Sequence, residues 1–169
     1  ASDVYKRQPL LVPVGGDEPS ASPVADSLVM EPVEAVSADG TAIEGYLVRP
    51  GRPEALSPRQ SRVRDTLKLR GRMPHLEAKP ELVVIATSWD QGVKGSLPLA
   101  EGLTGAGYTC LVWNPRGKND ARKFCTYGLK EYADVTALLD AVSRKQGGLP
   151  PVAAVGQGFG ACLLYTSDA

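Results

Sequence analysis

The sequence predicts an α/β fold in which flanking helices cover a mostly parallel sheet, and three observations support this prediction. Short apolar runs rich in β-branched residues recur along the chain, as in strands that are buried on both faces. Segments with helical spacing of apolar residues separate these runs. An Asp-Gly pair between two alternating segments also predicts a β-hairpin before the first buried strand. Such alternation of strands and helices is typical of parallel sheets with right-handed crossover connections.

The N-terminal part of the chain predicts an irregular segment followed by the hairpin. Residues 9–32 are rich in proline, serine, glycine and acidic residues, so we expect an extended lead-in. Glu34–Ser37 and Ala42–Pro50 then flank the Asp39-Gly40 turn, where glycine accepts the positive φ of hairpin turns. Gly45 interrupts the alternation of the second strand, which suggests a β-bulge.

A long basic connection separates the hairpin from the core. Residues 51–79 contain eight Lys or Arg and three Asp or Glu, and no aromatic side chain interleaves with them. The segment therefore offers no aromatic side chain on which a nucleic-acid base could stack. We expect a solvated insertion with a short helix over Arg62–Arg70. His75, the only histidine of the chain, lies within this insertion, and we expect no catalytic role for it.

The core elements follow in alternating order. Glu81–Ala86 and Tyr108–Trp113 predict two buried strands, and Ser96 is expected to cap the helix between them. Leu129–Arg144 shows the strongest helical periodicity, with acids near its start and bases near its end. Val152–Val155 then predicts a third buried strand, directly before a cluster of glycines.

The sequence VGQGFGA is the stretch most able to carry chemistry, and it fits two motifs. Gly156 and Gly160 match the nucleophile elbow G-x-S-x-G, with Gly158 at the position of the serine. Gly156, Gly158 and Ala161 match the dinucleotide-binding frame G-x-G-x-x-G/A, in which a helix N-terminus holds a pyrophosphate. In a third interpretation, the glycines only let a helix and a strand pack closely.

Five stretches in this order resemble an α/β-hydrolase of the esterase and prolyl-oligopeptidase-like type, over residues 34–161. They are SADGTAIEGYLVRP, LVVIATSWDQG, WNPRG, YGLKEYADVTALLDAV and VAAVGQGFGA. The resemblance implies the N-terminal half of that fold, as one truncated domain over residues 33–161. It also implies an oxyanion hole from the backbone N–H groups of Phe159 and of a residue near Trp89. The catalytic acid and histidine of the family come in later segments.

The sequence departs from the family pattern at the positions that carry the chemistry. Thr87-Ser88 stand where many members have His-Gly, and we expect Ser88 to make a hydrogen bond within its own loop. Asn114 stands where an Asp is frequent, and Gly158 supplies no nucleophile. We therefore predict a hydrolase-related protein without catalytic activity, whose ligand is a small ester or peptide-like molecule. The alternatives are an active esterase in which Gly158 is a sequence error, and a dinucleotide-binding protein.

Composition and charge argue against several other classes. Nineteen basic residues balance nineteen acidic ones, so no overall field favours nucleic acid or a membrane surface. No apolar run approaches the roughly 20 residues that span a bilayer. Three cysteines without a C-x-x-C pair predict neither a disulfide framework nor a zinc site, and Cys110 is expected in the core. We expect no cofactor and no metal.

Both ends of the chain resemble translated adapter sequence from metagenomic fragments. This resemblance covers residues 1–8 (ASDVYKRQ) and residues 162–169 (CLLYTSDA), and we expect neither segment to carry function. The true N-terminus would then be missing, so the sequence assigns no cellular compartment. A truncated sheet leaves an edge uncovered, and we expect the isolated chain to be poorly soluble.

Overall fold

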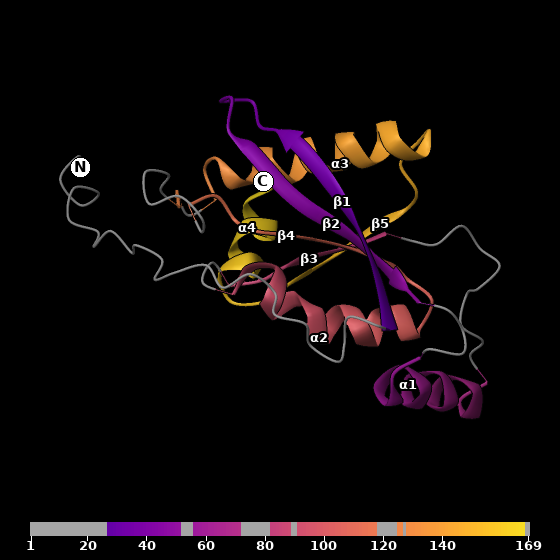
Figure 1. Ribbon diagram of the computed structural model, residues 1–169. Coiled ribbons are helices and arrows are strands. Elements are labelled where there is room, and N and C mark those ends of the chain that lie inside the picture. Colours follow the sequence, from indigo (N-terminus) through magenta and orange to yellow (C-terminus); the bar gives the residue numbers. More distant parts are fainter. Residues whose placement is uncertain are drawn as a thin grey trace.

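Strands and helices alternate through most of the described chain (Figure 1). The computed structural model describes residues 27–51, 56–71, 82–88, 91–117, 125–126 and 128–167, and for residues 165–167 it describes the backbone alone. The strands are β1 (Leu28–Val36), β2 (Ala42–Pro50), β3 (Leu82–Ala86), β4 (Thr109–Trp113) and β5 (Val152–Gly156). The helices are α1 (Pro58–Leu69), α2 (Gly92–Gly105), α3 (Glu131–Gln146) and α4 (Phe159–Ser167).

The five strands form one mixed sheet in the order β1-β2-β4-β3-β5. Strand β2 pairs antiparallel with both β1 and β4, whereas β3 pairs parallel with β4 and with β5. The prediction of an α/β fold is confirmed, but the prediction of a mostly parallel sheet is wrong. The physical reason is that the hairpin joins the main sheet through β2, so two of the four strand pairings are antiparallel.

Helices cover both faces of this sheet, with α2 on one side and α3 and α4 on the other (Figure 1). The alternation of side chains along each strand divides the core accordingly, because successive side chains point to opposite faces. In β3, Leu82 and Val84 pack toward α3, while Val83 and Ile85 pack toward α2. Cys110 of β4 is fully buried on the α2 side, as predicted, and burial raises the pKa of its thiol to about 12.

The hairpin differs from the prediction in two respects. Strand β1 begins at Leu28, so the expected irregular lead-in to residue 32 ends earlier than the sequence indicated. The β1–β2 register is continuous from Leu28↔Pro50 to Val36↔Ala42, so Gly45 makes no bulge. A Cβ on Gly45 would instead lie 3.1 Å from the Leu138 side chain of α3. Glycine at this position thus allows a helix to pack closely on the strand.

The basic insertion contains a helix that is anchored through polar contacts. Helix α1 starts four residues earlier than expected, because Ser57 and Gln60 form a capping box around Pro58. The Gln60 side chain is fully buried and donates to the Thr104 hydroxyl of α2 at 3.1 Å. A Cβ on Gly105 would lie 2.9 Å from the Gln60 backbone, so the two helices meet at this glycine.

Helices α2 and α3 also correct the sequence prediction in detail. Ser96 lies inside α2 rather than capping it, and its hydroxyl donates to the Gly92 carbonyl at 3.0 Å. Helix α3 starts two residues later than expected and ends at Gly147, whose φ of 71° lies in the left-handed region. The predicted helical periodicity includes Leu129 and Tyr132, but both side chains are mostly exposed, while Leu138 is fully buried.

Strand β5 lies at the edge of the sheet and is not buried as predicted. All of its residues are at least partly exposed, with Val152 41% and Val155 38% accessible. Its pairing partner is β3, and on the other side of β5 the structure describes no further strand of the sheet. An apolar edge strand of this kind favours association with other chains, so the expected poor solubility stays a prediction.

Candidate functional site

The candidate site lies at the carboxyl ends of the parallel strands β3 and β5. Strand β3 continues into α2 on one face of the sheet, whereas β5 continues into α4 on the opposite face. Neighbouring parallel strands whose connections diverge in this way form a crevice, which is where open α/β sheets bind their ligands. The last ladder pair is Ala86↔Gly156, and the same register continued by two residues brings Ser88 opposite Gly158.

Glycines shape the turn between β5 and α4. A Cβ on Gly160 would overlap the backbone carbonyl of Ala86, and a Cβ on Gly156 would lie 2.5 Å from the Ala161 Cα. Gly158 has a φ of +58°, in the left-handed region that favours glycine. The closest helix–strand approach thus occurs at Gly160, a position of the elbow frame, and not at Ala161, where the dinucleotide frame places its third glycine.

The loop after β3 holds its residues through hydrogen bonds. The Thr87 hydroxyl donates to the Gly92 carbonyl at 3.1 Å. The Ser88 carbonyl accepts from the backbone N–H of Gln91 at 3.0 Å, as expected for a residue bonded within its own loop. Its hydroxyl is directed elsewhere, because a Cβ on Gly158 would overlap the Ser88 Oγ. The Ser88 hydroxyl therefore lies directly against the elbow position at Gly158.

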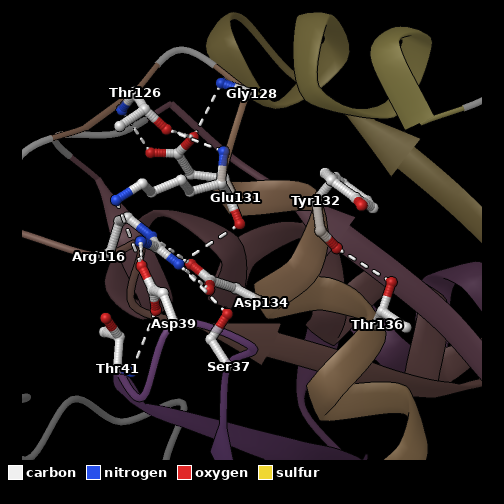
Figure 2. A network of polar contacts seen from close by, with 11 residues as sticks. Ser37, Asp39, Thr41, Arg116, Thr126, Gly128, Glu131, Tyr132, Asp134 and Thr136 are labelled. Carbon is white, nitrogen blue, oxygen red and sulfur yellow. Dashed lines mark hydrogen bonds and ion pairs between the residues drawn. The ribbon is translucent and has the colours of Figure 1, made fainter.

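The turn after β4 is fixed by charges. Arg116 is almost completely buried and pairs with both carboxylate oxygens of Asp134, with its Nε 2.8 Å from Oδ2. Its Nη1 lies 2.7 Å from Asp39 in the hairpin turn, so one guanidinium joins three segments of the chain (Figure 2). These contacts raise the pKa of Arg116 above its ordinary value and hold the pKa of Asp39 well below its own.

A second carboxylate orders the segment before α3. Glu131 accepts from the backbone N–H groups of Thr126 at 2.6 Å and Gly128 at 2.9 Å (Figure 2). Burial alone would raise the pKa of Glu131, but these hydrogen bonds outweigh it and the pKa is lowered.

At the carboxyl end of β4, the Asn114 side chain accepts from the Val93 N–H at 3.1 Å. An amide here supplies a helix cap where the family often has an acid.

The predicted site residues fall partly within the described chain. Gly158 and Phe159 lie at the turn into α4, together with Gly156 and Ala161 of the dinucleotide frame. Trp89 and His75 lie outside the described residues. The role of Arg116 was not predicted, although an arginine in a turn before an acidic helix start was a signal for it. The placement of Ser88 opposite Gly158 was not predicted either, and it follows from the parallel pairing of β3 with β5.

Three further features are absent from the described ranges: a metal cluster, a membrane-spanning helix and a disulfide. No group of three or more His, Cys, Asp or Glu side chains in this part of the chain could hold a metal ion. No helix among the same residues is both long and apolar enough to cross a membrane. Cys110 is buried, Cys125 is half-buried and Cys162 is exposed, and no disulfide joins any two of them.

Comparison with known proteins finds similarity in structure but not in sequence. No protein-family model and no curated protein matches the chain. The Pyrococcus furiosus esterase Pf2001 superposes with a TM-score of 0.61 at 14% identity, over 95% of this chain and 52% of that one. Brefeldin A esterase, a bacterial homologue of human hormone-sensitive lipase, superposes with a TM-score of 0.55 at 14% identity, over 92% of this chain and 38% of that one.

A third similar structure, DcsB in complex with its substrate analogue, has a TM-score of 0.52 at 16% identity, over 83% of this chain and 40% of that one. The chain therefore spans about half the length of the esterases that it resembles, or less. At these identities the similarity concerns the fold alone. The strand order, the divergent helices at β3 and β5, and these superpositions together show that the chain has the α/β-hydrolase fold, as its sequence predicted.

Proposed function

We propose that this chain belongs to a hydrolase-related protein that binds a small ester or peptide-like ligand without cleaving it. The observation that carries the proposal is Gly158, which stands at the elbow with a φ of +58° and has no side chain to act as nucleophile. Acyl transfer needs an oxygen or sulfur nucleophile with a base beside it. The part of the chain that the structure describes contains no histidine to serve as that base.

The crevice between β3 and β5 supports binding in the absence of catalysis. Gly158 is exposed there, and Ser88 is half-buried across from it. We place the oxyanion-hole donors at Phe159 and near Trp89, as the family resemblance implies. Such donors would recognise a carbonyl oxygen even where no nucleophile attacks the carbonyl carbon. The esterases with the same fold are consistent with ligands of this class.

Two acyl probes test the proposal. With p-nitrophenyl butyrate, we expect no release of p-nitrophenolate beyond the buffer rate. With the matching amide, p-nitrobutyranilide, we expect saturable binding in saturation-transfer NMR. Sustained ester hydrolysis by the chain would contradict the loss of catalysis and favour an active esterase. If the amide does not bind and NAD does, the dinucleotide-binding alternative replaces the proposal.

A further inference from the structure

Ser88 and Gly158 form a complementary pair across the crevice. An ideal Cβ on Gly158 would overlap the Ser88 Oγ, whereas the Ser88 Cβ would lie 3.6 Å away, in ordinary contact. The steric overlap with a Cβ on Gly158 therefore involves the hydroxyl oxygen of Ser88 alone. In this chain a hydroxyl occupies the volume into which a side chain on residue 158 would extend. It comes from the end of β3 and not from β5.

The backbone of Ser88 is held in place from several directions. Its carbonyl accepts from Gln91 N–H at 3.0 Å and from Gly92 N–H at 3.4 Å, at the start of α2. Thr87, the preceding residue, is bonded to α2 through its own hydroxyl. On the other side, the Gln157 N–H donates to the Ala86 carbonyl at 2.9 Å, which fixes the spacing of the two strand ends. These contacts fix the backbone of Ser88 and hence the direction of its Cα–Cβ bond, and in the observed rotamer the hydroxyl lies against Gly158.

From this geometry we infer that Ser88 is the residue that presents a hydroxyl to the bound ligand. It forms a hydrogen bond to the ligand's carbonyl group from the place that a side chain at position 158 would otherwise fill. The inference rests on the proposed function, because it needs an acyl ligand in the crevice. It adds a specific contact residue and requires no bond to be made or broken. Ser88 is thus a binding residue of the crevice, in addition to the hydrogen bond within its own loop that the sequence predicted.

A pair of serine variants tests the inference on the whole chain. Ser88→Ala removes the hydroxyl and keeps the Cβ, and the loss of one neutral hydrogen bond raises the Kd for p-nitrobutyranilide roughly 2- to 10-fold. The matched control is Ser143→Ala, which removes the same atom from α3, far along the chain from the crevice. The control leaves the Kd unchanged. Thermal unfolding followed by circular dichroism verifies that each variant is folded.

Gly158→Ala supplies the second test, because its methyl group would enter the volume of the Ser88 hydroxyl while Ser88 itself remains. This variant also raises the Kd if the hydroxyl lies at the elbow. An unchanged Kd in Ser88→Ala overturns the inference and leaves ligand binding intact. A raised Kd in Ser88→Ala with an unchanged Kd in Gly158→Ala also overturns it, since the hydroxyl would then act elsewhere. If the unmodified chain does not bind the amide, the proposed function itself fails.

Discussion

Two turns at the same edge of the sheet are specified in opposite ways. The turn after β4 depends on side chains, since buried Arg116 joins Asp134 and Asp39 in one network (Figure 2). The turn after β5 depends on the absence of side chains, since Gly156 and Gly160 admit backbone at distances that a Cβ would prevent. The first turn is filled with satisfied polar groups. The second turn is closely packed by backbone and by the Ser88 hydroxyl.

The difference shows that one edge of a sheet can hold two kinds of turn, one fixed by buried side chains and one fixed by close backbone packing. A buried ion-pair network resists change, because removal of one member leaves the others charged and unpaired. A glycine turn makes no side-chain contacts of its own, so its path depends on backbone conformation and on the close approach of its neighbours. Gly158 at the elbow is an example, because glycine adopts the required φ at little cost.

The largest expected effect comes from breaking the charged turn. Arg116→Met leaves Asp134 buried and unpaired, with 1% of its side chain exposed, and should lower the free energy of unfolding by about 3–5 kcal/mol. Urea unfolding followed by circular dichroism measures this change. The control is Arg49→Met, which removes a half-exposed pair with Glu31 and should cost about 0.2–1 kcal/mol. Equal losses in the two variants would show that the network contributes no more than a surface pair.

A smaller effect is expected from filling the glycine turn. Gly160→Ala places a methyl group on the backbone carbonyl of Ala86, which cannot rotate away, and should cost about 1–3 kcal/mol through strain. Gly102→Ala is the control, because nothing lies within 4 Å of the position that its methyl group would take. Since alanine favours the helix over glycine, this variant should raise the free energy of unfolding by about 0.5–1 kcal/mol. Unfolding in urea compares the two. Stabilisation by Gly160→Ala would mean that β3 and α4 are not in close contact.

Much of the fold could be predicted because local patterns and tertiary packing agree. The apolar run of β3 and the periodicity of α3 indicated elements close to those observed. The mixed sheet could not be predicted from local pattern, because the pairing of β2 with β4 joins residues far apart in sequence. The exposure of β5 was missed for the same reason. Its composition is that of a buried strand, but its place at the edge depends on what pairs beside it.

The candidate site could be predicted only where it depends on glycine. The cluster from Gly156 to Gly160 marked the turn, because close backbone approach and positive φ have few other solutions. Ser88 carried no such signal, since a serine after a strand is common in any loop. Its role needs the register of β3 against β5, which the apolar composition of the two strands leaves open. The sequence therefore located the turn but not its partner across the crevice.

The smallest expected effect is a difference in acid response between the segment before α3, which the Glu131 carboxylate holds, and the glycine turn. The pKa values of Glu131 and Asp39 are lowered in the folded chain from ordinary values of about 4. Their contribution to stability is therefore present above about pH 4 and is lost as the pH falls through the lowered folded-state values. The amide protons of Thr126 and Gly128, which bond to the Glu131 carboxylate, should lose protection from hydrogen exchange in this range.

The glycine turn supplies the internal reference for this measurement. The Gln157 N–H bonds to the Ala86 carbonyl, and no carboxylate takes part in that bond, so its protection should persist at the same pH. Exchange rates corrected for the intrinsic effect of pH, measured by NMR at about pH 6 and about pH 3, compare the two turns directly. Simultaneous loss of exchange protection in the segment before α3 and in the glycine turn would mean that acid unfolds the sheet as one unit. Loss of protection confined to the segment before α3 would show that the Glu131 carboxylate fixes this segment, whereas backbone packing fixes the glycine turn.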